Sequence, residues 1–376
     1  MLSGYTLHVR LTKRCNADCS YCSSRSSGGL ATKVMTADEY RQSLERIVGI
    51  LRQAGLPIGE MALTIQYVGG EILTVPKADL ANLVMVGQEV MGVHFGSVID
   101  GAQSNLIASE DRVMFLSSLF GRRLSTSIDA YTDQRTLDGS PDKYRQVVKI
   151  NIDTLKRRRQ FIAPAIFVVD HLGLPHIHSV ISDAEVDGQA LRLRPVFQGG
   201  SDINVPDVDE LALSFGLAAR NWLMKSRVRV DPFAEMLDAR LRSCGGDGSA
   251  VQSHNSCPFS DACGKQSLCL EPNGDLFLCL DMADAGLMPL GNALTGGFDY
   301  ERLAEFGSRN LHQDCRQCEY LEACRGGCQF EAVKATGSTG GKTPLCRVWK
   351  SVFSEIDQSI SQFGAASVEQ WLRGLN

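Results

Sequence analysis

Apolar and polar residues alternate with a period of two in several short stretches, which is the pattern of half-buried β-strands. The first stretch is Tyr5-Thr6-Leu7-His8-Val9-Arg10-Leu11. The same alternation predicts strands over residues 5–12, 61–68, 97–101, 123–128, 164–169 and 191–196. Because helical patterns separate these strands, we expect an α/β domain built on a parallel sheet.

The helical segments have a period near 3.6 and recognisable starts. A capping box, Thr36-Ala37-Asp38-Glu39, opens the first helix, which extends to Leu51. Further helices are predicted over 77–91, 109–119, 142–158, around 174–186, from Val208 to Lys225, and from Pro344 to Phe363. After about residue 240, glycine-rich and loop-like segments dominate. Such a stretch buries few apolar side chains, so we expect metal centres to stabilise it.

Composition and charge narrow the classes of function. The chain has 376 residues, a net charge of −5 and 13 cysteines. The acidic balance gives no support to a nucleic-acid partner, and the apolar stretch from Val90 to Ile99 is too short to span a bilayer. The N-terminus lacks the layout of a signal peptide. Cysteines without an export signal indicate metal ligation in a reducing compartment. We therefore predict a cytoplasmic protein with no membrane partner.

Three cysteines follow the first predicted strand, in the run Cys15-Asn16-Ala17-Asp18-Cys19-Ser20-Tyr21-Cys22. Three thiolates on one short loop can hold three irons of a [4Fe–4S] cluster, which is normally held by four thiolates. The fourth iron is then open to an exchangeable ligand, as a catalytic cluster requires. This motif resembles that of the radical S-adenosylmethionine (SAM) enzymes. The resemblance implies a partial (β/α)6 barrel, a cluster on Cys15, Cys19 and Cys22, SAM on the open iron, and Tyr21 beside the cofactor.

Most of the other cysteines form a second constellation near the C-terminus. One pattern is Cys263-x10-Gly274-x4-Cys279. The other is Cys315-x2-Cys318-x5-Cys324-x3-Cys328, followed by Cys346. Together they resemble the SPASM domain, a module that carries two auxiliary [4Fe–4S] clusters in peptide-modifying and protein-modifying enzymes. A zinc ribbon on the C-x2-C pair is the alternative, but zinc explains neither the number of cysteines nor the N-terminal triplet.

The resemblance also implies which cysteines share a cluster. One auxiliary cluster takes Cys315, Cys318, Cys324 and Cys346. The other takes Cys263, Cys279, Cys328 and one upstream cysteine, for which Cys257 fits the spacing best and Cys269 and Cys244 are alternatives. The predicted domains are the barrel (1–205), a helical bridge (206–243), the SPASM domain (244–350) and a C-terminal helix and tail (351–376). The predicted cofactors are SAM and three [4Fe–4S] clusters.

Several polar segments at strand ends predict a SAM pocket. After the second strand, Gly69 and Gly70 let the backbone approach a ligand, and Glu71 can receive an ammonium group. In the family this Gly-Gly-Glu motif holds the amino group of SAM. By the same resemblance, Asn105, Ser127 and Asp129 contact the cofactor, and Leu193 offers an apolar platform for adenine. Each of these polar residues could also be a turn former, but their placement on successive strand ends favours a pocket.

Two features of the sequence bear on the substrate: the resemblance to the SPASM domain, and one difference from a related group of enzymes. The layout is similar to that of anaerobic sulfatase-maturating enzymes, which carry an aspartate directly after the cysteine that matches Cys279. Here that position is Leu280, and Asp281 follows. We therefore predict a maturase that oxidatively modifies a ribosomally made peptide or protein through a thioether or carbon–carbon crosslink, with Asp281 as a candidate base. The alternatives are formylglycine formation on a sulfatase, a small-molecule dehydrogenation or rearrangement, and an iron–sulfur electron carrier.

The predicted chemistry implies partners. Reduction of a cluster needs a flavodoxin or a ferredoxin-type electron donor. Only a few residues precede the first strand, so we expect no N-terminal leader-binding module. We then expect the barrel, the region near 200–260 or a separate leader-binding protein to bind a leader peptide.

Overall fold

The computed structural model describes residues 3–25, 33–196, 205–244, 259–260, 262–307 and 310–375. Its centre is a sheet of ten strands in the order β12-β11-β10-β1-β3-β4-β5-β7-β8-β9. Six parallel strands form the barrel: β1 (Ser3–Arg10), β3 (Met61–Val68), β4 (Ser97–Ser104), β5 (Leu124–Ser127), β7 (Ala165–Val169) and β8 (Leu191–Pro195). These are the six strands that the alternating pattern predicts.

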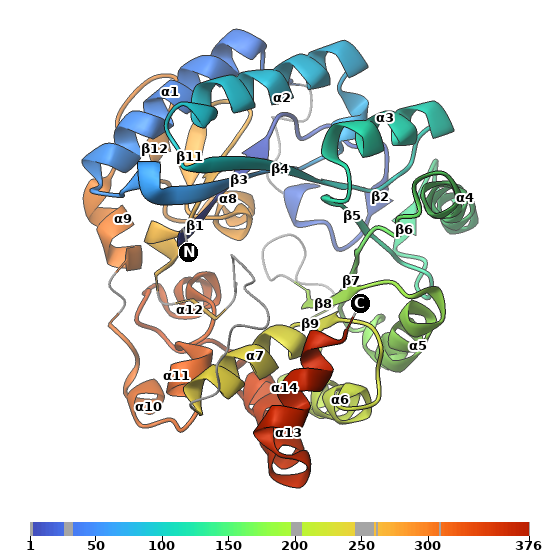
Figure 1. Cartoon of the computed structure of the whole chain (residues 1–376). Helices are drawn as coiled ribbons and strands as arrows, with labels where there is room; N and C mark the ends of the chain where they lie inside the picture. Colours follow the sequence, from blue (N-terminus) through green and yellow to red (C-terminus); the bar gives the residue numbers. More distant parts are fainter. Residues whose placement is uncertain are drawn as a thin grey trace.

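Helices cover the outside of the barrel strands (Figure 1). They are α1 (Ala37–Gln53), α2 (Lys77–Gly92), α3 (Glu110–Phe120), α4 (Pro141–Arg159) and α5 (Ile177–Asp187). The capping box of α1 forms as the sequence predicts, because the Thr36 hydroxyl accepts from Glu39 N while Glu39 accepts from Thr36 N. The expected helix around 174–186 begins as a short 3₁₀ turn, η4 (Leu174–His176), before α5.

The sheet extends beyond the barrel on both edges. On one side β9 (Val230–Asp231) pairs with β8. On the other, β10 (Ser267–Leu270) pairs in parallel with β1, and β11 (Asp275–Phe277) and β12 (Gly291–Asn292) continue the sheet in antiparallel fashion. These strands could not be predicted from the sequence, because two to four residues are too few to display a period. The cysteine-rich region therefore shares its sheet with the barrel.

Shorter helices build the C-terminal region, with α6 (Val208–Trp222) and α7 (Phe233–Ser243) leading into it. The others are α8 (Leu280–Ala285), α9 (Tyr300–Gly307), α10 (Gln313–Arg316), α11 (Leu321–Cys324), α12 (Gln329–Thr336), α13 (Cys346–Phe363) and α14 (Ala365–Arg373). In Figure 1 α6, α7, α13 and α14 gather at one end of the molecule. The helix predicted from Pro344 begins instead at Cys346.

Two large apolar cores hold these layers together. The first joins the inner residues of β1, β3 and α1–α3 to Leu268, Leu276 and Phe306 of the cysteine-rich region. The second joins β7, β8 and α5–α7 to Trp349 and Phe353 of α13. Each core thus combines residues from both sides of the boundary predicted at residue 244. That boundary marks a change in composition, and the division into domains stays a prediction.

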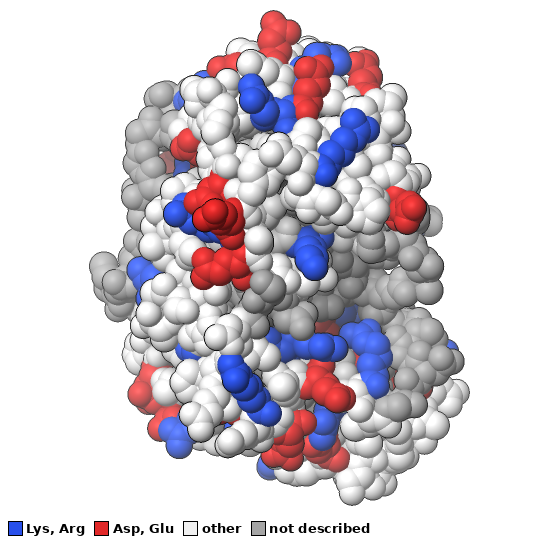
Figure 2. Space-filling view, turned by 90° about the vertical axis from the view of Figure 1, so that its left-hand side faces the viewer, with Lys and Arg blue, Asp and Glu red and all other residues white. Residues whose placement is uncertain are grey.

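The surface carries both signs of charge. On the face shown in Figure 2, acidic and basic side chains are interspersed. Ion pairs in the described chain include Arg41 with Glu89 and Arg220 with Glu355, both at 2.7 Å. Among the described helices, none combines the length and the apolar character that a membrane span requires.

Candidate active site

The carboxyl ends of the barrel strands surround a pocket of 470 Å³. Because parallel strands end at the same edge of a sheet, segments that are far apart in the sequence meet there. The pocket brings together most of the residues that the sequence predicts for the cofactor site: Cys15, Cys19, Cys22, Gly69, Gly70, Glu71, Asn105 and Ser127. The candidate base Asp281 lines the same pocket.

The cysteine loop leaves β1 and is fixed by local hydrogen bonds. Residues Asp18–Cys19 form β2, which pairs with β6 (Arg135–Thr136), and Cys22 N donates to Cys19 O at 3.1 Å. Desolvation raises the pKa of the Cys15 thiol to about 11, and Glu71, Cys19 and Cys22 add to the increase. Burial likewise raises the pKa of Cys19. Metal binding at this loop must therefore displace protons.

Arg135 was not found from the sequence, and it places a positive charge in the pocket. Its guanidinium lies between Tyr21 and Tyr144, at 5.8 and 5.5 Å from the ring centroids, and donates to Ser127 O at 3.1 Å. Tyr21 itself is buried and supports Arg135. Burial raises the pKa of Tyr21 well above its ordinary value, so the phenol stays neutral. Arg135 can face a ligand carboxylate.

The Gly-Gly-Glu loop follows β3 and approaches the backbone of the cysteine loop closely. Gly69 and Gly70 have φ of +85° and +37°, which favours glycine. Glu71 is 2% exposed and accepts hydrogen bonds from Leu73 N, the Ser104 hydroxyl and Asn105 N at 2.9, 2.8 and 2.6 Å. Burial raises the pKa of Glu71, and these donors oppose the increase.

The next two strand ends contribute amides and hydroxyls. The Asn105 amide donates to Asn16 Oδ1 at 2.9 Å and lies 3.8 Å from Cys15 Sγ, so it links β4 to the cysteine loop. The Gln103 amide donates to the Ser127 hydroxyl at 2.9 Å. Asp129 does not line the pocket. It is buried and accepts from the backbone and hydroxyl of Thr132 at 2.9 and 2.6 Å, as a turn former does.

A second pocket of 320 Å³ adjoins the first, and apolar side chains dominate its lining. The two pockets share Arg194, Leu280 and Asp281. The second pocket reaches Cys279 and Cys328, and it holds Leu193, which does not line the first. Asp281, at the start of α8, forms an ion pair with Arg194 of β8.

His8 also lines the apolar pocket. Burial, Arg10 and Arg194 lower the pKa of His8 to about 4, so the imidazole is neutral. Its Nδ1 atom is buried without a hydrogen-bond partner.

Four cysteines assigned to one auxiliary cluster lie around a single small cavity between α10, α11 and the start of α13: Cys315, Cys318, Cys324 and Cys346. Burial raises the pKa of Cys324 to about 12, and the other three cysteines contribute to the increase. Segments separated by α12 and the residues that follow it thus supply thiol groups to one place. The shared ligation of a cluster by these four cysteines, which the resemblance implies, stays a prediction.

The ligands predicted for the other auxiliary cluster are only partly described. Cys279 and Cys328 line the apolar pocket, and Cys263 opens η6 (Cys263–Lys265). Cys257 lies outside the described residues. Of the alternatives, Cys269 is buried in β10 and its thiol donates to Glu271 at 3.8 Å, and Cys244 is exposed at the end of α7.

One set of thiol groups in the described chain fits an iron–sulfur cluster. In the described part of the chain, no three His, Cys, Asp or Glu side chains converge as a single metal ion requires. In a cubane cluster each thiolate binds a different iron, so the ligands lie around a cluster-sized cavity and do not converge on one point. The sulfur-only set around the α10–α13 cavity has this arrangement.

Known proteins resemble this chain in sequence and in fold. No protein-family model matches the chain. The chain is 22% identical to the "PqqA peptide cyclase" of Streptomyces rochei, over 90% of its own length and 88% of that protein. The structure of anSMEcpe with bound AdoMet and Cp18Cys peptide superposes with a TM-score of 0.74 at 17% identity, covering 97% of this chain and 99% of that one. Streptococcus suis SuiB bound to precursor peptide SuiA gives 0.57 at 13% identity, covering 92% and 76%.

The chain therefore has the fold of the radical SAM enzymes. More narrowly, it shares the fold of anSMEcpe over nearly its whole length, including the cysteine-rich C-terminal region. The fold class predicted from the sequence is confirmed.

Proposed function

We propose that the protein is a radical SAM maturase that oxidatively modifies a ribosomally synthesised peptide or protein, by a thioether or carbon–carbon crosslink. The observation that carries this proposal is the pair of adjoining pockets. One unites Cys15, Cys19 and Cys22 with Glu71, and the other reaches two proposed auxiliary ligands, Cys279 and Cys328. A substrate between them touches both the site of hydrogen abstraction and the site of electron removal.

The relatives support a peptide as the substrate. The curated relatives are named PqqA peptide cyclases and align over 90% of this chain. Three of the solved structures with this fold contain a peptide. A peptide also suits the second pocket, because 320 Å³ of apolar space can enclose one large side chain.

The first pocket offers a residue for each charged group of SAM. Glu71 would hold the ammonium group, and Arg135 would hold the carboxylate. Asn105 and Ser127 offer an amide and a hydroxyl for the ribose. Bound to the cluster of Cys15, Cys19 and Cys22, SAM would supply a 5′-deoxyadenosyl radical that removes a hydrogen atom from the substrate.

The second pocket would hold and deprotonate the substrate. Oxidation requires the loss of one more electron and one proton after hydrogen abstraction. Asp281 lies where the pockets meet and can accept that proton, with Arg194 fixing the direction of its carboxylate. Leu193 belongs to the wall of this pocket, so we assign it to the substrate side.

The remaining partners follow from the chemistry. We infer three [4Fe–4S] clusters, a flavodoxin or ferredoxin-type electron donor, and a peptide leader that is bound by this chain or by a separate protein. The cytoplasm provides the reducing conditions that free thiols and such clusters need.

The test is the mass of candidate precursor peptides after incubation with anaerobically reconstituted enzyme, SAM and a reductant. A crosslink removes a pair of hydrogen atoms from the peptide for each 5′-deoxyadenosine formed. We expect that loss with a precursor encoded near the gene. The proposal is wrong if every such peptide keeps its mass while a free metabolite is transformed.

Formylglycine formation on a sulfatase is the second candidate, and the near-complete overlap with the fold of anSMEcpe favours it. Leu280 at the position expected for an aspartate weighs against it. A carbonyl-trapping reagent added to the same assay separates the two, because formylglycine is an aldehyde and a crosslink is not. Mass alone separates them only for a cysteine target, since a serine target and a crosslink both lose two hydrogen atoms.

A further inference from the structure

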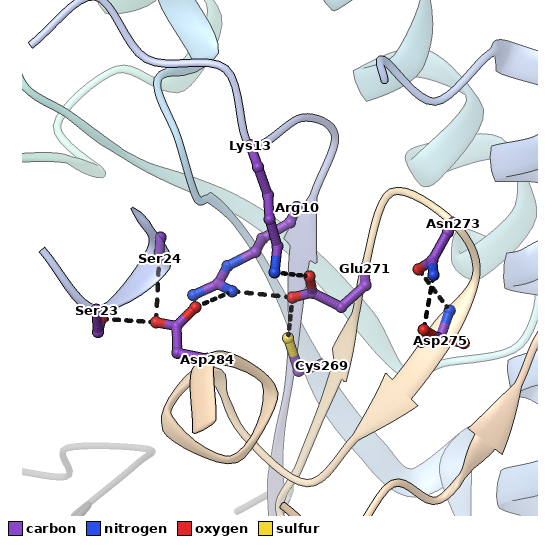
Figure 3. Close-up of polar contacts among 9 residues, drawn as sticks. All are labelled: Arg10, Lys13, Ser23, Ser24, Cys269, Glu271, Asn273, Asp275 and Asp284. Carbon is purple, nitrogen blue, oxygen red and sulfur yellow. Dashed lines mark hydrogen bonds and ion pairs between the residues drawn. The ribbon is translucent and has the colours of Figure 1, made fainter. Parts of the chain in front are cut away.

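A buried network of charges lies at the base of the first pocket (Figure 3). Arg10 Nη1, from the end of β1, is 3.0 Å from Glu271 Oε1 and 2.5 Å from Asp284 Oδ1. Lys13 Nζ is 2.7 Å from Glu271 Oε2. The side chains of these four residues are all 5% exposed or less. Two cations and two carboxylates balance one another.

The network attaches both ends of the cysteine loop to the C-terminal region. Lys13 precedes Cys15 by two residues, and Ser23 follows Cys22 directly. The hydroxyls of Ser23 and Ser24 donate to Asp284 Oδ2 at 2.7 and 3.3 Å. The acidic partners come from the other side: Glu271 follows β10, and Asp284 belongs to α8, which begins directly after Cys279. Figure 3 shows Arg10 between the two carboxylates.

Arg10 also explains the first glycine of the Gly-Gly-Glu loop. A Cβ atom on Gly69 would lie 2.3 Å from Arg10 Cγ, and one on Gly70 would lie 2.2 Å from the Arg14 carbonyl oxygen. Contacts this short are sterically impossible, so the loop can pack here only with glycine. Both glycines therefore serve the approach of the loop to Arg10 and Arg14, whether or not a ligand is bound.

We propose that Arg10 is a positioning residue that holds three segments in one arrangement: the cysteine loop, the Gly-Gly-Glu loop and the start of α8 after Cys279. Through this network the C-terminal region orders the site at which SAM is cleaved. The inference rests on the proposed cluster at Cys15, Cys19 and Cys22, and it does not depend on the peptide substrate.

Because the charges of the network are buried, the attachment of the cysteine loop to the C-terminal region is sensitive to substitution of a single residue. Removal of one partner from a buried ion pair leaves a charge without compensation, which is costly in a low-dielectric interior. If Glu271 is neutralised, Lys13 loses the carboxylate charge 2.7 Å from its Nζ atom while Arg10 keeps Asp284, and the loop ends are expected to separate from β10. Because sub-ångström placement decides the rate of an oriented reaction, SAM cleavage would suffer before the fold does.

The test compares Glu271→Gln and Asp284→Asn with Asp275→Asn in the full-length, reconstituted enzyme. Asp275 is a matched control from the same hairpin as Glu271. Its carboxylate accepts from the amides of Asn273 and Asn292 at 2.7 and 2.8 Å and does not contact the network. Three quantities are measured without any peptide: the electron paramagnetic resonance spectrum of the reduced enzyme with and without SAM, the rate of 5′-deoxyadenosine formation, and tryptic cleavage after Lys13 and Arg14.

We expect Glu271→Gln and Asp284→Asn to lose the SAM-dependent change in the spectrum and to lower the rate by about tenfold to a hundredfold. Trypsin should cut both variants faster in the cysteine loop, and Asp275→Asn should match the wild type. The proposal is overturned if the network variants match the wild type, or if Asp275→Asn loses the signals equally.

Two further variants keep the test decisive. If Glu271→Gln does not fold, the double variant Ser23→Ala, Ser24→Ala removes two hydroxyl contacts to Asp284 and leaves all four charges in place, and it should show a smaller loss of the same kind. Arg10→Lys keeps the charge and should recover part of the spectrum that Arg10→Met loses. A wild-type enzyme without a SAM-responsive cluster would refute the proposed function instead, and the tryptic cleavage rates would still decide whether the network orders the loop.

Discussion

Glu71 accepts hydrogen bonds from two backbone N–H groups and the Ser104 hydroxyl, yet it is almost fully buried. Burial raises the pKa of this carboxyl above its ordinary value of 4.5. The folded protein therefore retains a proton there at a pH where the unfolded chain has lost it. The associated stabilisation is present at low pH and is lost as the pH rises from 4.5 through the folded pKa.

The same shift predicts how SAM binding depends on pH. An ammonium group binds the ionised carboxylate, so the affinity should fall as the pH decreases through the raised pKa of Glu71. Glu71→Gln should weaken binding by about tenfold or more, as expected for the loss of a hydrogen bond to a charged group, and should remove this pH dependence. Equilibrium dialysis of labelled SAM at several pH values measures both effects. Equal affinity in the variant would contradict the role of Glu71.

Substitution of Asp281 should separate SAM cleavage from the oxidation of the substrate in the proposed reaction. Asp281→Asn removes the proton acceptor but leaves the cysteine loop and the Gly-Gly-Glu loop in place. We expect product formation to fall by about tenfold or more, while 5′-deoxyadenosine still forms without coupling to product. Chromatography of both products measures the ratio. An unchanged product yield would exclude Asp281 and leave deprotonation to solvent or to the substrate itself.

Individual residues of the site could be predicted from the sequence where they belong to a short local motif. Cys15, Cys19, Cys22 and Gly69–Glu71 are such residues, and the structure places them in one pocket. Arg135 was missed because no local motif names it, and the link between Arg10 and Asp284 was missed because the two residues are 274 positions apart. No spacing rule contains that information, since it arises only when β10 pairs with β1.

At the scale of elements, the long strands and helices follow from hydrophobic periodicity. The six barrel strands lie within a few residues of their predicted positions because each repeats the alternation several times. Short elements such as β9, β12 and α10 were not predictable, since two to four residues complete at most one period. In the cysteine-rich region, thiol spacing carried more information than periodicity did.

The start of α1 offers a test of local stability. Thr36 makes a capping box, whereas Ser109 begins α3 without a side-chain cap. Thr36→Ala should lower the free energy of unfolding by about 1 kcal/mol, and Ser109→Ala should change it much less. Thermal or chemical denaturation of the two variants side by side measures the difference. Equal losses would show that the capping box does not stabilise α1.

The thiol ligands of the cysteine loop can be removed by substitution without changing the other cysteine-bearing segments. Replacement of Cys15, Cys19 and Cys22 together by Ala should abolish reductive cleavage of SAM, because those thiolates belong to one loop. The cysteines around α10–α13 lie on other segments, so the auxiliary clusters should remain, with a loss of about four irons per chain. Continued formation of 5′-deoxyadenosine would refute the assignment of this loop.

At the scale of the whole molecule, the barrel and the cysteine-rich region are parts of one sheet and of the same two cores. The boundary seen in the composition is therefore not a boundary in packing. This continuity places Asp281 in the lining of both pockets and Cys279 in the lining of the second, and it lets Arg10 contact Asp284. Sequence composition could not predict it, because the pairing of β10 with β1 is a long-range contact.

We propose that one chain holds a SAM-binding cluster and two auxiliary clusters. The iron content of the anaerobically reconstituted enzyme, measured per chain together with acid-labile sulfide, tests it most directly. Three four-iron clusters predict about twelve irons per chain. A value near four or eight, with the protein fully folded, would contradict the account.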